Sequence, residues 1–472
     1  HEAFGIHLIT YARFAPALFT VAALCLLYGF VYRLDGDRDS ALVAAVMAGM
    51  GANVYFAHGT AAGIVRGPGL ALAFATLFSA LSVLRRQGRG NTVPILTGVL
   101  FGLTALTHLS YAVFTGLGLL LLFAFASDLP SLRVALRRCA LIAGSAALLV
   151  SPWLILVISR YGWSPFTAAG GTHGTFDFWL QSGGDPIRFT RLFGSWVLNL
   201  GSDWSPTSLA GLGLFGLGYS LWKGKWFLPA WLLATGAVLG EVSRYGEILG
   251  STLAATALVS IVPLRAHNAA HGEKTHSLRR ALLYILIVGT VVYQGGRTIS
   301  RHRPSLTDPL REAAAWLRNE SQPDAPFLLV PNQHSPTEWL PYLARRDLAI
   351  SHWGAEWTGD YNEQLRLQSE LAVCSRRQSF ACLEELSARL ENPPSCLVIS
   401  KQLPGLIEQF VVHNEWNQYF ENQDYVVMGL EEQCAQRRSA WDGNQRVGEV
   451  MSLAAVSAVS TGTRPDLRSA AP

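Results

Sequence analysis

Residues 8–32 read LITYARFAPALFTVAALCLLYGFVY and contain one charged side chain, that of Arg13. A helix crosses the hydrocarbon core of a bilayer with about 20 mostly apolar residues, so this stretch predicts a membrane-spanning helix. The composition of the whole chain agrees, because 50% of its 472 residues are hydrophobic and only 15% are charged. These values exclude a disordered chain, a small disulfide-bonded scaffold and a nucleic-acid-binding protein.

Nine further apolar stretches follow, each closed by charged residues, Pro or Gly. The ten predicted spans are residues 8–32, 41–56, 69–84, 93–107, 111–126, 140–159, 208–222, 226–240, 248–264 and 281–294. Several contain only about 15 residues, so a re-entrant segment is an alternative for one or two of them. The predicted fold is an α-helical polytopic membrane protein with about ten transmembrane helices.

Basic residues alternate between successive loops of this arrangement. Every second loop is rich in them, and these loops together hold Arg33, Arg38, Arg85, Arg86, Arg89, Arg133, Arg137, Arg138, Lys223, Lys225, Arg265, Lys274, Arg279 and Arg280. The intervening loops hold Arg66, Arg160, Arg188, Arg191 and Arg244. Short cytoplasmic loops collect Lys and Arg, so we expect the first set inside and the second set outside the plasma (inner) membrane. The chain after Arg297 is then expected outside the cytoplasm.

The charge balance changes near residue 297. Residues 1–296 carry 20 basic and 11 acidic side chains, whereas residues 297–472 carry 17 and 22. We therefore predict a transmembrane domain over residues 1–296, with a long outer loop at 160–206, and an extracytoplasmic domain over residues 297–436. Residues 437–472 are rich in Ser, Ala, Gly and Thr, which predicts a disordered tail.

The predicted extracytoplasmic domain alternates apolar strands with helices. Strands are predicted at residues 327–330, 396–400 and 425–428, and helices at 309–319, 365–373, 379–390 and 406–414. This order indicates a small α/β domain. It contains Cys374, Cys382, Cys396 and Cys434, four of the six cysteines. An oxidising compartment would join these four in two disulfides with three possible connectivities, and free buried cysteines are the alternative.

Ionisable side chains gather at the predicted outer ends of the spans. Such groups are costly at membrane depth and are usually functional or specifically paired. The candidate substrate-binding residues are His58, Arg66, His108, Glu241, Arg244 and Glu247. An outward-facing site of this composition suits an anionic head group, because Arg binds phosphate oxygens with two parallel hydrogen bonds.

Each candidate also has a purely structural interpretation. The two histidines can be interfacial residues that hydrogen-bond a backbone carbonyl, and the two arginines can extend to the interface without binding a ligand. Glu241 and Glu247 lie three residues on either side of Arg244, a spacing that also suits a local ion pair. The aromatic residues of loop 160–206 suit a segment that lies on the bilayer surface.

Short motifs carry a resemblance to a known family. They are residues 5–7 (GIH), 63–67 (GIVRG), 106–110 (LTHLS), 337–342 (TEWLPY) and 354–357 (GAEW). Together with the multiple spans, the long outer loop and the outer α/β domain, they make the chain similar to the GT-C integral membrane glycosyltransferases, which include the protein-mannosyltransferase-like enzymes and an uncharacterised bacterial and archaeal subset. One departure is that His108 is followed by Leu109, where the family prefers Pro.

The resemblance implies transfer of a sugar from a polyprenyl-phosphate carrier to a glycan, lipid or protein acceptor on the outer face of the membrane. In that family an acidic residue of the first outer loop deprotonates the acceptor hydroxyl, which attacks the anomeric carbon while the lipid phosphate leaves. The acidic residue would lie upstream of His1, so the chain is expected to be N-terminally truncated. Arg66, Arg244 and His108 would stabilise the departing phosphate.

Metal binding and two other functions stay open. Asp177 and Asp185 supply oxygen atoms suited to a divalent metal ion, but they lie eight residues apart, and no other cofactor is predicted. A transporter or flippase of lipid-linked or small polar substrates would have a similar number of spans, although transporters usually show inverted repeats and polar residues near the midplane. A non-catalytic membrane assembly protein would instead bind a partner through its outer domain.

Overall fold

The computed structural model describes residues 8–59, 63–85, 90–125, 131–172, 177–199, 207–240, 243–261, 274–300, 306–330, 339–413, 416–430 and 433–435. The chain forms two compact units. The helical unit comprises His1–Pro304 with Gly354–Asn362, and the α/β unit comprises Ser305–Trp353 with Glu363–Pro472. The sequence does not predict that residues Gly354–Asn362 belong with the helical unit.

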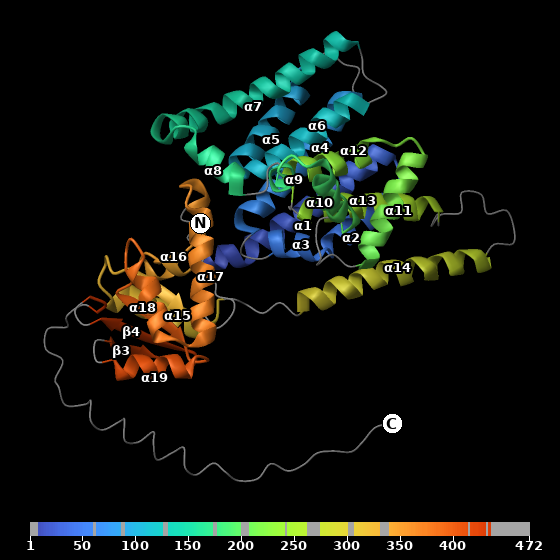
Figure 1. The fold of residues 1–472 in the computed structure, drawn as a ribbon. Coiled ribbons are helices and arrows are strands. Elements are labelled where there is room, and N and C mark those ends of the chain that lie inside the picture. Colours follow the sequence, from blue (N-terminus) through green and yellow to red (C-terminus); the bar gives the residue numbers. More distant parts are fainter. Residues whose placement is uncertain are drawn as a thin grey trace, which may run out of the picture. The chain divides into compact units, whose positions relative to one another are not determined.

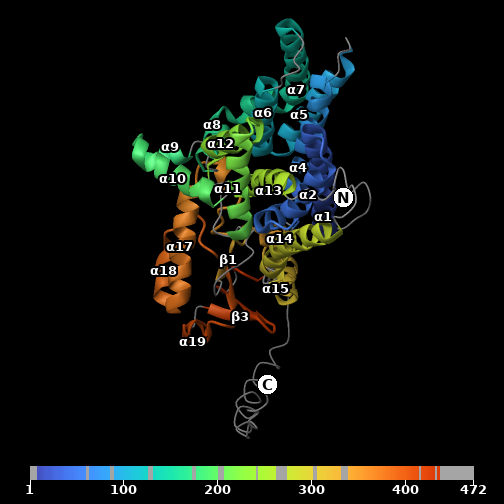
Figure 2. The same ribbon diagram turned by 90° about the vertical axis from the view of Figure 1, so that its right-hand side faces the viewer.

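In its described residues, the helical unit contains fourteen α-helices and two short turns of other helix types. They are α1 (Leu8–Asp35), α2 (Arg38–Gly49), α3 (Ala52–Val54), the π-helical turn η2 (Tyr55–Gly59), α4 (Gly63–Arg85), α5 (Thr92–Thr107), α6 (Leu109–Phe125), α7 (Leu132–Tyr161), α8 (Ser164–Thr172), α9 (Asp177–Ser182), α10 (Pro186–Leu198), α11 (Thr207–Trp222), α12 (Phe227–Leu239), α13 (Ser243–Ile261), α14 (Lys274–Ser300) and the 3₁₀ turn η3 (Ala355–Trp357). Helix α4 packs against α1, α5 and α6 (Figures 1 and 2), and η3 contacts α8.

Three of the described helices, α1, α4 and α7, are long and apolar enough to cross a membrane. Helix α2 and the segment Ala52–Gly59 together form a fourth candidate span, which is bent by 65° between its two parts. The other predicted spans coincide with α5, α6, α11, α12, α13 and α14, which are shorter or more polar. The chain therefore has the helices of a membrane protein, and the count of ten spans stays a prediction.

Glycines set the spacing of two helix pairs in this unit. A side chain at Gly98 of α5 would collide with the backbone of Ile142 in α7. A side chain at Gly216 of α11 would collide with the backbone of Leu253 in α13. Small residues let membrane helices approach closely, so these glycines are packing positions.

Among the residues that the structure describes, the α/β unit contains one four-stranded sheet. Its elements are α15 (Asp308–Glu320), β1 (Phe327–Val330), α16 (Leu340–Ala344), α17 (Tyr361–Arg377), α18 (Phe380–Ala388), β2 (Cys396–Ser400), α19 (Pro404–Val412), β3 (Trp416–Glu421) and β4 (Tyr425–Leu430). The strand order is β1-β2-β4-β3. Strands β1 and β2 are parallel, and the β2–β4 and β3–β4 pairs are antiparallel.

Helices cover both faces of this sheet. Leu328, Leu397 and Val426 point to one face, where they form a core with side chains of α17, α18 and α19. Phe327 and Val398 point to the other face and pack with side chains of α15 and α16. Alternate residues of a strand point to opposite faces, so burial on both sides explains why strand β1 is fully apolar and why β2 is apolar up to its last residue, Ser400.

The structure joins the four cysteines of this unit in two disulfides. Cys374 of α17 bonds Cys382 of α18, and Cys396 of β2 bonds Cys434. The fourth strand, β3, is absent from the sequence prediction, because its residues (WNQYFE) are half polar and lie at the sheet edge. The predicted tail over residues 437–472 lies outside the described residues.

Candidate functional site

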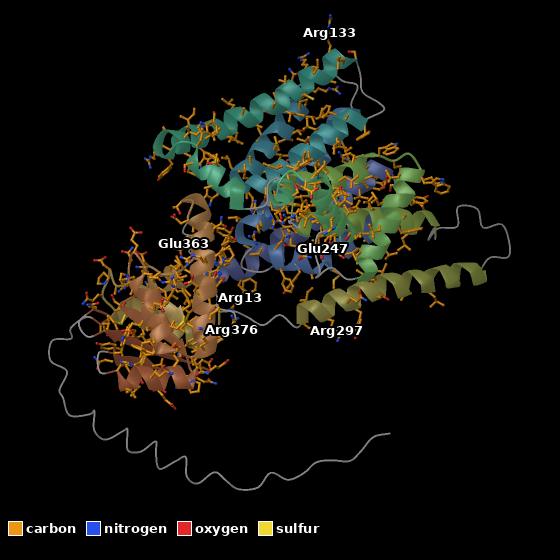
Figure 3. The ribbon with its side chains drawn as sticks, in the orientation of Figure 1. Arg13, Arg133, Glu247, Arg297, Glu363 and Arg376 are labelled. Carbon is orange, nitrogen blue, oxygen red and sulfur yellow. A yellow bond between two sulfur atoms is a disulfide. The ribbon has the colours of Figure 1, made fainter. Side chains whose placement is uncertain are left out.

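A buried carboxylate fixes the bend between α2 and η2. Glu247 of α13 is fully buried in the interior of the helical unit (Figure 3), and it accepts hydrogen bonds from the backbone N–H groups of Asn53 (3.0 Å) and Val54 (3.2 Å). The side-chain amide of Asn53 donates a third bond at 2.7 Å. These N–H groups begin a helix and have no partner within it, so the carboxylate satisfies them. A Cβ at Gly51 would lie 2.5 Å from Glu247 Oε2, so only glycine leaves room for this contact.

His58 lies in the π-helical turn that follows and is fully buried. Its Nδ1 lies 2.8 Å from the carbonyl oxygen of Val54, and because a carbonyl only accepts, Nδ1 donates this bond. Nε2 of the neutral ring is then an acceptor, and the hydroxyl of Tyr111 donates to it. Both ring nitrogens are engaged, so His58 fixes the position of Tyr111.

The hydroxyl of Ser110, in α6, connects two side chains of α13 with the histidine that caps α5. It accepts hydrogen bonds from the Tyr245 hydroxyl at 3.1 Å and from Arg244 Nη2 at 3.4 Å. Ser110 Oγ also lies 2.9 Å from Nδ1 of His108, the residue that caps α5. Since two donors already point at Oγ, its own proton is directed at His108 Nδ1, which leaves the proton of the neutral ring on Nε2.

The guanidinium of Arg244 lies beside two tyrosine rings. Its Cζ is 5.5 Å from the ring centroid of Tyr111 and 5.0 Å from that of Tyr245, distances at which an aromatic ring attracts a cation. Tyr245 is itself held by stacking on Phe114, with ring centroids 4.5 Å apart. Within the described ranges, no carboxylate forms an ion pair with Arg244, and its buried Nε has no hydrogen-bond partner. This surrounding suits an anion.

Arg66 lies in the first turn of α4 and belongs to the same cluster. Its positive charge acts on His58 and Tyr111. Two glycines bring this end of α4 close to both residues. A Cβ at Gly69 would lie 3.0 Å from the Tyr111 ring, and a Cβ at Gly63 would collide with the His58 carbonyl. We call His58, Arg66, His108, Ser110, Tyr111, Arg244, Tyr245 and Glu247 the outer-end cluster, after the side of the membrane on which the sequence predicts these helix ends.

The structure thus brings together most of the residues that the sequence singles out. His58, Arg66, His108, Arg244 and Glu247 meet in one cluster, whereas Glu241 lies outside the described residues. Sequence reasoning misses Tyr245 and Asn53. Tyr245 directly follows Arg244, and no sequence pattern indicates that its ring contacts the guanidinium of Arg244. Asn53 lies in a stretch that resembles an unbroken span.

The expected outer loop at residues 160–206 contains the short helices α8, α9 and α10. Asp185 caps α10 by accepting a hydrogen bond from the backbone N–H of Ile187 at 2.9 Å. Trp179 of α9 stacks on Phe189 of α10, with ring centroids 4.1 Å apart. In the part of the chain that the structure describes, no three His, Cys, Asp or Glu side chains gather as a metal site. Asp185 therefore has a capping role.

Solved structures share this architecture. The oligosaccharyltransferase AglB from Archaeoglobus fulgidus, in complex with an inhibitory peptide and a dolichol-phosphate, aligns with a TM-score of 0.52 and 11% identity over 83% of this chain and 58% of its own. An Archaeoglobus fulgidus oligosaccharyltransferase tethered with an acceptor peptide aligns with a TM-score of 0.51 and 12% identity over 87% and 61%. The arabinofuranosyltransferase AftD from Mycobacteria aligns with a TM-score of 0.50 and 14% identity over 91% and 34%. These neighbours are GT-C glycosyltransferases.

The chain shares the fold of these GT-C glycosyltransferases. This result confirms the resemblance that the short motifs indicate. The chain spans 58% of the length of AglB and 34% of that of AftD. No protein-family model and no curated protein matches the sequence. At identities of 11–14%, the likeness concerns the GT-C fold alone.

Proposed function

We propose that the protein is an integral membrane glycosyltransferase that takes a sugar from a polyprenyl-phosphate carrier. The GT-C fold and the three long apolar helices support this proposal. AglB was solved with a dolichol-phosphate, which is a polyprenyl-phosphate of the same chemical class. The acceptor is a glycan, a lipid or a protein on the outer face of the membrane.

The observation that carries the proposal is the position of Arg244. Its charge lies beside two tyrosine rings, and no described carboxylate neutralises it. A buried charge is costly unless an ion of opposite charge pairs with it. A phosphate group at this position would accept hydrogen bonds from Nε and from the terminal nitrogens, the geometry that guanidinium groups favour.

The proposed reaction breaks the bond between the anomeric carbon and the carrier phosphate. The acceptor hydroxyl oxygen forms the new bond to that carbon, its proton passes to a base, and the phosphate leaves with the electron pair. Arg244 and Arg66 would stabilise the negative charge that develops on the departing phosphate. His108, whose Nε2 carries the proton in the neutral ring, would donate a further hydrogen bond to a phosphate oxygen.

Two candidate residues act through others in this proposal. His58 is fully buried and fixes Tyr111, and Glu247 fixes the turn on which His58 lies. We therefore assign both to positioning and neither to substrate contact. Glu247 is unsuited to be the base, because its carboxylate already accepts three hydrogen bonds from Asn53 and Val54.

The experiment is donor consumption by the protein in proteoliposomes. Wild-type protein is supplied with a panel of radiolabelled polyprenyl-phosphate sugars, and the release of the free carrier phosphate is measured. Arg244→Gln is expected to lower the rate by about 100-fold or more, the usual cost of removing one group that stabilises developing charge. Arg160→Gln is the matched control, because Arg160 is exposed at the end of α7.

One result would overturn the proposed function, and another would overturn the phosphate role of Arg244 alone. The first is that the wild-type protein consumes no donor of the panel and binds no polyprenyl phosphate; transport assays of lipid-linked substrates would then be the next step. The second is that Arg244→Gln and Arg160→Gln consume donor at the same rate. In that case the enzyme would be established and the phosphate role of Arg244 would be wrong.

A further inference from the structure

A second site lies at the other ends of the helices that carry the outer-end cluster. Three helices carry residues of both places: α4, α6 and α13. Ser110 lies near the start of α6 and Leu122 twelve residues further on, which at 1.5 Å per residue is roughly 18 Å along the axis. The corresponding separation between Arg66 and Leu81 is roughly 22 Å. The second site therefore belongs to the opposite side of the helical unit.

This site is a cavity of about 510 Å³. Its walls are mostly apolar, and they include Leu81, Leu84, Leu122 and Phe125 from α4 and α6. Ligand pockets in proteins have volumes of about 300–1,000 Å³, with apolar walls and a few polar groups that orient the ligand. The cavity has both properties, because its polar lining side chains are few: Asp35, Ser220, Lys225 and Thr256.

Two of the polar side chains, one acidic and one basic, form an ion pair. The Asp35 side chain is only 10% exposed and forms an ion pair with Lys225 at 3.2 Å. Thr256 Oγ1 donates a hydrogen bond to the other oxygen of the Asp35 carboxylate at 3.0 Å. The Lys225 side chain is 51% exposed and therefore reaches solvent or lipid head groups. A ligand that binds beside Asp35 and Lys225 therefore contacts a negative and a positive group that lie 3.2 Å apart.

A fourth polar group in the cavity, the hydroxyl of Ser220, has no partner among the described residues. Ser220 lines the cavity and is 1% exposed, and its hydroxyl oxygen forms no hydrogen bond with any residue that the structure describes. Buried polar groups are hydrogen-bonded in almost all native structures, so an orphan hydroxyl in a cavity wall points to a bound molecule. The cavity is also flanked by Trp226, which is 53% exposed, and indole rings are enriched at the membrane interface.

We propose that the cavity binds a phospholipid whose head group carries both a phosphate and a primary ammonium. The ammonium would donate hydrogen bonds to Asp35, the phosphate would accept from Lys225, and an oxygen of the glycerol ester region would accept from Ser220. The acyl chains would lie along the apolar walls. The loops at this end are those rich in Lys and Arg, so the lipid belongs to the leaflet expected at the cytoplasmic side.

The test is native mass spectrometry of the full-length protein after exchange into vesicles of defined composition. The vesicles contain equal amounts of dioleoyl phosphatidylethanolamine, phosphatidylcholine and phosphatidylglycerol. Wild-type protein is expected to retain phosphatidylethanolamine about 10-fold more than phosphatidylcholine, because the trimethylated head group cannot donate hydrogen bonds to Asp35. Equal retention of the two lipids would overturn the proposal, and this comparison needs no variant.

Variants locate the lipid in the cavity. Asp35→Asn is expected to remove the preference for phosphatidylethanolamine, and Leu122→Trp to abolish tight retention by filling the cavity. Lys223→Gln is the matched control, because Lys223 lies 4.3 Å from the Trp222 ring and does not line the cavity. If Leu122→Trp retains the lipid as the wild type does, the lipid binds elsewhere. If soluble glycerophosphoethanolamine at the same concentration displaces the lipid, the apolar walls do not contribute and the proposal is wrong.

Discussion

At the scale of single residues, Glu247 determines where the π-helical turn with His58 lies. Replacing Glu247 by Gln weakens its bonds to the backbone N–H groups of Asn53 and Val54, because a neutral amide accepts less strongly than a carboxylate. We expect a loss of about 1–3 kcal/mol in the stability of the turn. Hydrogen exchange of the amides of residues 52–59 measures this loss as faster exchange.

The matched control is Glu391→Gln, since Glu391 is exposed in the α/β unit. It should leave the exchange of residues 52–59 unchanged. Unchanged exchange in Glu247→Gln as well would contradict the positioning role of this carboxylate.

The sequence predicts the charged members of the outer-end cluster because membrane burial makes charges conspicuous. Arg66, His108 and Arg244 stand out in apolar surroundings at the ends of predicted spans. The supporting rings do not, since Tyr245 and Phe114 are common residues of an apolar helix. Their role depends on the packing of α6 against α12 and α13, which no local pattern contains.

At the scale of elements, the two disulfides of the α/β unit close loops of different length. Cys396 and Cys434 are 38 residues apart, whereas Cys374 and Cys382 are 8 apart. A disulfide limits the unfolded chain more when its loop is longer, which gives about 4 kcal/mol for the first and about 2.5 kcal/mol for the second. Replacing each pair by Ala should therefore lower the urea midpoint of the α/β unit more for Cys396 and Cys434.

Pulse proteolysis of the detergent-solubilised protein across a urea series measures both midpoints. The wild-type protein without and with reductant provides the reference. An equal shift for the two pairs, or no shift for either, would contradict this prediction.

Helices α17 and α18 are joined by a charge network with a defined pH dependence. Glu370 pairs with Arg366 of its own helix and with Arg389 at the end of α18. The hydrogen bond from Arg389 is the main cause that holds the pKa of the Glu370 carboxyl below its ordinary value. A lowered folded-state pKa means that the stabilisation is present above the unfolded-state pKa of about 4.3 and is lost as the pH falls through the folded-state value.

We therefore expect the protection of α18 amides against hydrogen exchange to fall in acid, below about pH 4.3. The network is exposed and partly screened, so the change is small. Glu370→Gln should show the lower protection already at neutral pH and no further fall in acid. A fall of the same size in wild type and Glu370→Gln would assign the effect to other groups.

The elements themselves were predictable where their pattern is strong. The buried strands β1 and β2 and the predicted spans coincide with elements of the structure because their residues are continuously apolar. Two features could not be predicted locally. Strand β3 is half polar because its side chains are only partly buried, and the break between α2 and η2 depends on Glu247, which lies nearly 200 residues away in the sequence.

At the scale of the whole molecule, the ten-span topology is open to a direct test. Reporter fusions after Asn199, Lys225 and Arg303 test on which side of the membrane each of these positions lies. Alkaline phosphatase should be active after Asn199 and Arg303, and green fluorescent protein should be fluorescent after Lys225, because short Lys- and Arg-rich loops stay in the cytoplasm. One missed span would reverse every position beyond it. Alkaline phosphatase activity after Lys225, or fluorescence of green fluorescent protein after Asn199 or Arg303, would therefore contradict the topology.

The central claim is that the outer-end cluster binds the phosphate of a polyprenyl-phosphate carrier. The most direct measurement is a cryo-electron microscopy structure of the protein in lipid nanodiscs saturated with polyprenyl phosphate. We predict density for the phosphate within hydrogen-bond distance of Nε and the terminal nitrogens of Arg244, with Arg66 and His108 around it. Phosphate density elsewhere, or Arg244 paired with a carboxylate in the lipid-saturated protein, would contradict the claim.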